Sequence, residues 1–126
     1  MQIVRVEHED GYGMFRSSTK PICLSNSGDP VLNRLWNRHS TCGDPGMPLP
    51  CHDGIDLDMG GKNWYCGFGS MDDFNKWVMP DEAKALISYG FKVLLISANE
   101  FQIGGHQVVY TKSSITSVED ISSLFK

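Results

Sequence analysis

Hydrophobic and polar residues alternate at the start of the chain, and this alternation predicts a β-strand over residues 2–8. Val4 and Val6 fall on one side of the alternation, whereas Arg5 and Glu7 fall on the other. β-branched residues at a period of two favour a strand with one apolar face. We therefore expect a first strand that presents a cation and an acid on its second face.

Helical spacing of apolar residues appears three times, after Asp29-Pro30, after Ser70 and from Pro80 to Gly90. Aspartate and serine accept hydrogen bonds from the free N–H groups of a helix start, and proline fits its first turn. Glycine commonly follows a helix end. The three expected apolar stripes are Val31, Leu32, Leu35 and Trp36; Met71, Phe74, Trp77 and Val78; and Ala83, Leu86 and Ile87.

Further strands are expected over residues 64–68, 91–98 and 106–112, the last after a turn at Gly104-Gly105. Residues 91–98 are almost continuously apolar, which is typical of a central strand. Strands before, between and after two middle helices predict an α+β fold rather than a regular βαβ series. We expect a small mixed or antiparallel sheet with two or three helices.

Two segments have their own character. Residues 39–62 are rich in glycine and proline, and a loop of this length in a compact domain is usually functional or mobile. Near the C-terminus, Ser117 is expected to cap a last helical turn or two, with Val118, Ile121 and Phe125 buried.

Length and charge limit the classes of function. The 126 residues suit one domain, here residues 1–126. The net charge is −4 and no basic run occurs, so a large nucleic-acid footprint is not expected. No apolar run reaches the length of a membrane span, and the first residues lack a signal-peptide core. We expect a cytoplasmic protein without a nucleic-acid or membrane partner.

The loop over residues 39–62 contains candidate metal ligands. Cys42, Cys51 and His52, with His39 nearby, are the soft ligands that zinc prefers. Their spacing is poor, because neighbouring Cys-His residues seldom reach one metal and no Cys-x-x-Cys occurs. We favour loop thiols and solvated histidines, and no bound metal is expected.

Three aspartates in the same loop, Asp53, Asp56 and Asp58, resemble half of a calcium loop. A calcium loop requires glutamate at its twelfth position. If Asp56 is the first position, the twelfth is Gly67. A turn network, in which the carboxylates accept hydrogen bonds from loop amides, is the better interpretation.

The residues 67–70, Gly-Phe-Gly-Ser, lie where a strand should run into a helix. Glycines permit close approach, and a helix start offers N–H groups to an anion. Arg5 could hold a phosphate or ribose, and Gln107 or Glu100 could orient a ribose hydroxyl. From the sequence alone, an Arg5–Glu7 surface pair and ordinary strand positions explain the same residues.

The whole pattern resembles a family of small uncharacterised proteins found in phages and bacterial genomes. The resemblance runs through the early Arg-Val-Glu strand, the Pro-Leu-Pro loop at residues 48–50, the Cys-Gly-Phe-Gly-Ser junction at residues 66–70, and Gly-His-Gln-Val-Val-Tyr at residues 105–110. It implies a phage protein, which would be located in the host cytoplasm, and brings no activity with it.

The order of elements is also similar to a minimal ADP-ribosyltransferase fold. That resemblance implies NAD as cofactor, with Arg5 on the pyrophosphate or ribose, Tyr65 and Phe68 stacked on a flat ring, and Ser70 donating to an oxygen anion. Gln107 would take the late-strand position, where most such enzymes have a glutamate that stabilises the oxocarbenium-like transition state. An amide offers only a dipole to a developing cation, so Glu7 or Glu100 would have to substitute.

Three functions follow from the sequence, of which the third is a structural zinc module built on Cys42, Cys51 and His52. The first is a nucleotide-binding domain of the NAD type that transfers ADP-ribose to a protein or other acceptor, with Gln107 and Glu7 as catalytic residues. The second is a non-enzymatic, phage-encoded inhibitor of a host or defence protein complex, which would use the loop of residues 39–62 and exposed aromatic residues as its partner surface.

Overall fold

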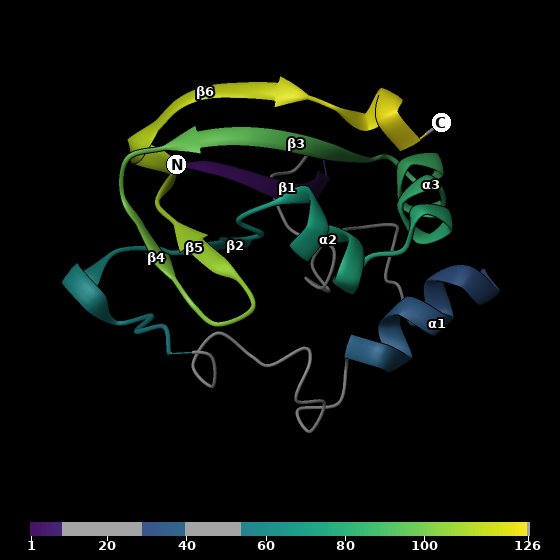
Figure 1. Cartoon of the computed structure of the whole chain (residues 1–126), viewed down its shortest axis with the longest axis horizontal. Helices are drawn as coiled ribbons and strands as arrows, with labels where there is room; N and C mark the ends of the chain where they lie inside the picture. The colour runs from purple at the N-terminus through teal and green to yellow at the C-terminus, as the bar shows by residue number, and fades with distance from the viewer. Residues whose placement is uncertain (9–28, 40–53, 126) are drawn as a thin grey trace.

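The computed structural model describes residues 1–8, 29–39 and 54–125, without the side chains of residues 36–39. This part of the chain is mixed α+β, as the sequence predicts (Figure 1). Its helices and strands, in order, are β1 (Gln2–His8), α1 (Pro30–His39), β2 (Tyr65–Gly67), α2 (Met71–Trp77), α3 (Pro80–Ser88), β3 (Phe91–Ala98), β4 (Phe101–Ile103), β5 (Val108–Tyr110) and β6 (Ile115–Asp120).

Two small antiparallel sheets form in the described residues, with strand orders β1-β3-β6 and β2-β5-β4. Val4 and Phe68 join them, because each donates its N–H to the carbonyl of the other over 2.8 Å. The strands therefore follow one another from β6 through β3 and β1 to β2, β5 and β4, as Figure 1 shows. β3 is a central strand, as expected.

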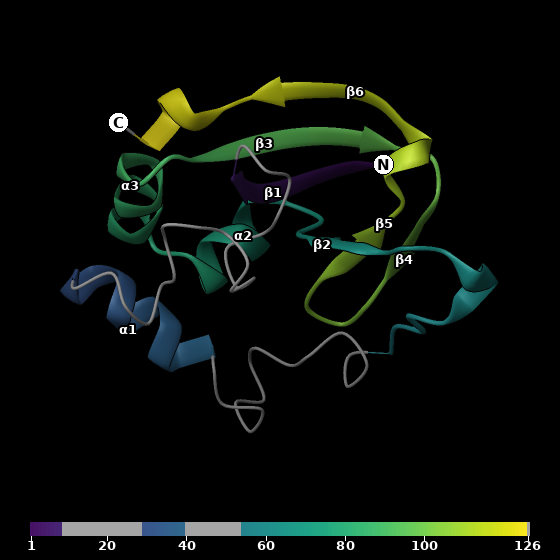
Figure 2. The same cartoon turned by 180° about the vertical axis from the view of Figure 1, so that it is seen from behind.

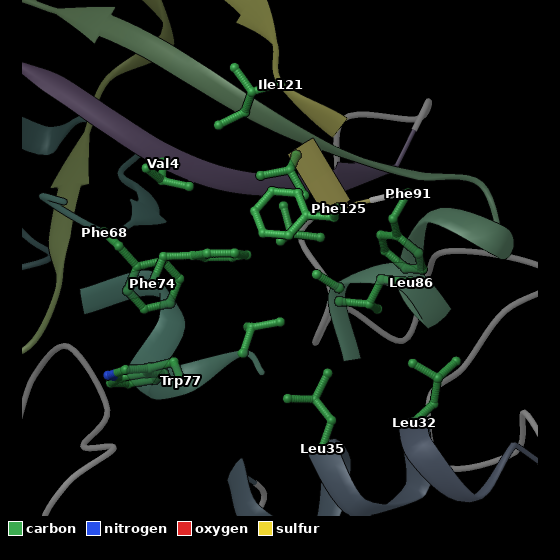
Figure 3. Close-up of a cluster of buried hydrophobic side chains, with 14 residues drawn as sticks. Val4, Leu32, Leu35, Phe68, Phe74, Trp77, Leu86, Phe91, Ile121 and Phe125 are labelled. Carbon is green, nitrogen blue, oxygen red and sulfur yellow. The ribbon is translucent and has the colours of Figure 1, made fainter. Parts of the chain in front are cut away.

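The sheet of β1, β3 and β6 has buried side chains on both faces. Val4 and Val6 pack among the side chains of α1, α2 and α3 (Figure 3). Ile3, on the opposite face, packs with Tyr110 and Val108 of β5. Helices thus cover one face and β5 covers part of the other; Figure 2 shows the helices and the smaller sheet from behind.

The predicted helix ends are confirmed. The Ser70 hydroxyl accepts from the Asp73 N–H over 3.1 Å at the start of α2. Asp29 accepts from the Val31 N–H over 2.8 Å at the start of α1. Gly90 follows α3 with a φ of 94°, which suits glycine because it has no Cβ.

The predicted cap at Ser117 is wrong, because residues 115–120 form β6 and pair with β3. The expected helical turn forms later, as the 3₁₀ turn Ser122–Phe125. Residues 115–120 have the serine and acid of a helix start, but their β-branched residues also suit a strand, and pairing with β3 decides the outcome. Ile121 and Phe125 are buried as expected, whereas Val118 is 54% exposed. β4 was not predicted from the sequence.

Of the predicted loop over residues 39–62, the structure describes His39, which ends α1, and the last part from Gly54 onward. This last part contains a short 3₁₀ turn, Met59–Gly61. The Asp56 carboxylate accepts from the Asp58 N–H over 3.0 Å. This contact confirms that Asp56 takes part in a turn network of the kind expected from the sequence.

Candidate functional site

Arg5 is buried on β1 with only 5% of its surface exposed. Its Nε donates to a Glu7 carboxylate oxygen over 2.7 Å, and its Nη1 donates to the Cys66 carbonyl over 2.7 Å. The sequence predicted the ion pair between Arg5 and Glu7, but it did not predict that Arg5 is buried. The guanidinium therefore links β1 to β2 from inside the protein, where both charge-assisted hydrogen bonds are strong.

Tyr65 lies beside two cations. The Arg5 guanidinium carbon is 5.4 Å from the centre of the Tyr65 ring, and the Lys112 Nζ is 4.6 Å from it. Lys112 also lies 3.6 Å from the second oxygen of Glu7. Arg5, Glu7, Tyr65 and Lys112 thus form one cluster, which we call the Arg5 cluster. Aromatic rings attract cations placed over their faces.

Tyr110 adds a buried hydroxyl next to the Arg5 cluster. Its ring centre is 6.2 Å from that of Tyr65, and no described residue makes a hydrogen bond to its hydroxyl. Burial raises the pKa of the Tyr110 hydroxyl well above its usual range, and the nearby Arg5 only partly opposes the shift. Lys112 and Tyr110 were not predicted as site residues, although strand alternation places them on one face.

Phe68 and Ser70 lie apart from the Arg5 cluster and have structural roles. The Phe68 ring is buried, with ring centres 5.7 Å from Phe74 and 5.3 Å from Trp77 (Figure 3). Ser70 is exposed and caps α2. The face of the Phe68 ring is thus occupied by other aromatic residues in this structure.

Gln107 lines a half-open hollow of about 200 Å³. Apolar side chains, glycines and three polar residues surround it: Met1, Gly69, Asp73, Ile103, Gly104, Gly105, His106, Gln107 and Val108.

The structure brings together Arg5, Glu7 and Tyr65 of the six predicted site residues. It places Phe68 in the helix-side core, Ser70 at a helix cap and Gln107 in this separate hollow.

Glu100 holds the end of the long loop against the smaller sheet. Its carboxylate accepts from the Thr111 hydroxyl over 2.7 Å and forms an ion pair with Lys62. Lys62, followed by Thr111, holds the pKa of Glu100 below its ordinary value. Glu100 thus connects Lys62, at the end of the loop, to Thr111, which directly follows β5.

The candidate metal ligands lie mostly outside the described residues. These are Cys42, Cys51, His52 and Asp53, together with the side chain of His39. Within residues 1–8, 29–35 and 54–125, no group of three or more histidine, cysteine, aspartate or glutamate side chains could hold a metal ion. The same part of the chain contains no helix with the length and apolar character needed to cross a bilayer.

Comparison with known proteins identifies a family rather than an activity. The chain gives no match among curated proteins or solved structures. A family model described as Bacteriophage T4 Y00F protein matches residues 1–124, which is nearly the whole chain. This protein therefore belongs to the Bacteriophage T4 Y00F protein family.

Proposed function

We propose that this phage protein is a non-enzymatic binding protein whose target is a host or defence protein. The observation that carries the proposal is a set of exposed apolar side chains on β4 and on the loop that is hydrogen-bonded to it, which we call the β4 patch. Its members are Leu57, Met59, Phe101 and Ile103.

The members of the β4 patch belong to two segments that are joined by hydrogen bonds. The Gln102 amide accepts from the Asp56 N–H over 3.0 Å and donates to the Asp56 carbonyl over 2.8 Å. The Lys62–Glu100 ion pair joins the same two segments again. The loop is therefore held beside β4 before any partner arrives, which lowers the ordering cost of binding.

Grouped apolar side chains at a surface are typical of protein interfaces, whereas single exposed apolar residues are ordinary. Ile103 is 64% exposed and also lines the hollow beside Gln107. A partner side chain of modest size fits a volume of about 200 Å³. The β4 patch with its hollow thus offers an apolar surface and a recess for one anchoring side chain.

Capture from host lysate tests the proposal. The purified protein should retain one dominant host protein, and Ile103→Lys should abolish that retention because it places a charge in the β4 patch. Met79→Lys is the matched control, since Met79 is also an exposed hydrophobic residue but lies between α2 and α3. Equal capture by all three proteins, or capture of nothing, would contradict the proposal.

A nucleotide ligand of the NAD type is the second candidate, and the Arg5 cluster supports it. Arg5, Glu7 and Tyr65 lie together, and the side chain of Lys112, which lies against the Tyr65 ring, is 38% exposed. An ADP-ribosyltransferase-like reaction would require Arg5 to exchange its contacts with Glu7 and Cys66 for contacts with the ligand. It would also require Gln107 to approach the cluster from its separate hollow.

Titration with NAD tests this second candidate. A ligand present at about one hundred times its dissociation constant adds about 2.7 kcal/mol to the free energy of unfolding. The stabilisation should disappear in a Lys112→Met variant if the Arg5 cluster is the site. A thermal transition that does not respond to NAD or to related nucleotides would exclude it.

A further inference from the structure

β6 is an outer strand along one side of the sheet. It pairs with β3, and no described residue forms a ladder on its other side. Both views show β6 along the top edge of the described part, above β3 (Figures 1 and 2). An outer strand carries backbone N–H and carbonyl groups that can pair with another chain.

The hydrogen-bond pattern shows which backbone groups of β6 face outward. The Ile121 N–H donates to the Val93 carbonyl over 2.9 Å. Antiparallel pairs alternate between bonded and non-bonded residues, so the pair of Glu119 and Leu95 is also bonded. The intervening pair of Val118 and Ile96 is not bonded, and the N–H and carbonyl of Val118 point away from β3.

The side chains beside this edge combine apolar and acidic character. Val118 is 54% exposed, and Leu124, in the turn after β6, is 69% exposed. Glu119 and Asp120 are exposed acids on neighbouring positions. The nearest base on β3 is Lys92, which lies beyond the end of β6 in the register. The outer strand therefore presents open backbone groups, apolar side chains and negative charge.

We propose that β6 binds an extended segment of a protein partner as an additional strand, and that this segment alternates basic and apolar residues. A residue opposite Val118 would exchange two backbone hydrogen bonds with it and place an apolar side chain against it. The next residue would place a basic side chain opposite Glu119. Strand addition of this kind draws affinity from the backbone and specificity from alternate side chains. The inference rests on the proposed function only in that the partner is a protein.

Charge selects a basic partner segment over a second copy of this chain. Each copy carries a net charge of −4, so two copies repel at long range. A lysine-containing or arginine-containing segment is attracted, and its binding should weaken as added salt screens the charges. The experiment must therefore distinguish binding of a basic segment from self-association of two copies through β6.

Amide exchange followed by NMR provides the test, with a capped synthetic peptide of alternating lysine and valine as the probe. Without peptide, the Val118 amide should exchange quickly while the Glu119 amide is protected, because only the latter bonds to β3. The peptide should slow exchange at Val118. A matched peptide of alternating glutamate and valine should have no such effect. A peptide with N-methyl groups along one edge should bind roughly tenfold more weakly or not at all.

Two substitutions separate the backbone contribution from the charge contribution. Val118→Pro removes an outward N–H without removing a bond to β3, and proline is tolerated at such positions of outer strands. It should abolish peptide binding, whereas Val118→Thr should retain most of it. Glu119→Lys should weaken binding and reverse the preference between the two peptides. Unchanged protection of β3 amides in each variant shows that the sheet is intact.

Several outcomes would overturn the inference. These are unchanged Val118 exchange with the lysine peptide, equal effects of the two charged peptides, or full binding of the N-methylated peptide. Concentration-dependent dimers that protect Val118 without peptide would assign the edge to a second copy. Ile103→Lys should leave peptide binding unchanged, so failure of the β4 patch and failure of the β6 edge are distinguishable.

Discussion

Arg34 on α1 reaches the buried carboxylate of Glu82 on α3, with 3.1 Å between Nε and Oε2. Its Nη2 also lies 2.7 Å from an Asp81 oxygen. Asp81 and then Glu82 raise the pKa of the Arg34 guanidinium, and Arg34 lowers the pKa of Asp81. Glu82 is fully buried and its other oxygen accepts from the Met79 N–H over 2.9 Å. One carboxylate thus caps α3 and connects it to α1.

Glu82→Ala should therefore destabilise the protein by about 2–4 kcal/mol, because it leaves the Met79 N–H without its acceptor and deprives Arg34 of its buried partner on α3. Asp81→Asn is the control, since the Asp81 side chain is 55% exposed. Its effect should be under about 1 kcal/mol. Urea denaturation followed by circular dichroism measures both values. Equal losses of unfolding free energy in the two variants would show that the burial of Glu82 does not contribute to stability.

Glu100 should make stability depend on pH in the acidic range. Its pKa in the folded protein is below the ordinary value of 4.5, chiefly because of Lys62. The unfolded chain then binds more protons, so the contribution is complete above about pH 4.5 and is lost as the pH falls through the lowered folded-state value. Glu100→Gln should lose stability at neutral pH and show a smaller further decrease on acidification. Thermal unfolding between neutral and acidic pH measures the difference, and parallel curves for the two proteins would contradict it.

Gly67 lies where β2 crosses β1, and this crossing leaves no room for a side chain. A Cβ at Gly67 would collide with the Ile3 side chain and would lie 2.9 Å from the Val4 carbonyl oxygen. Gly67→Ala should cost about 1–3 kcal/mol, because the backbone must move to accept the methyl group. Gly69→Ala is the matched control, since its Cβ would meet the flexible end of Met1 at 3.2 Å and a methyl group of Val108 at 3.3 Å. The control should lose less stability in the same denaturation experiment.

The sequence predicted those parts of the fold whose local pattern agrees with their tertiary environment. The Ser70 cap, the Gly90 helix end and the central strand β3 each have a strong local pattern. Residues 115–120 have no such distinctive pattern, because their serine, β-branched and acidic residues suit a helix start as well as an outer strand. Pairing with β3 is a long-range interaction that local spacing does not contain.

The candidate site was less predictable than the fold. Alternation placed Arg5 and Glu7 on one face, and the structure adds that Arg5 is buried against Cys66 and Tyr65. Residue types alone made Gln107 an equally good partner for Arg5. The residue that reaches Arg5 depends on which strand lies next to β1. That strand is β2, which brings Tyr65 to Arg5, whereas Gln107 lines a separate hollow.

Tyr110→Phe should leave stability unchanged or raise it by up to about 1 kcal/mol. The Tyr110 hydroxyl is buried and no described residue bonds to it, so the folded protein loses the hydration of this group without recovering a hydrogen bond. Thr111→Val is the matched control on the next residue, because it removes the bond to Glu100 and should destabilise the protein by about 1 kcal/mol. Urea denaturation of the two variants side by side provides the measurement. A loss of several kcal/mol in Tyr110→Phe would show that the hydroxyl has a bonding partner in solution, and the neighbouring Arg5 cluster would then extend to Tyr110.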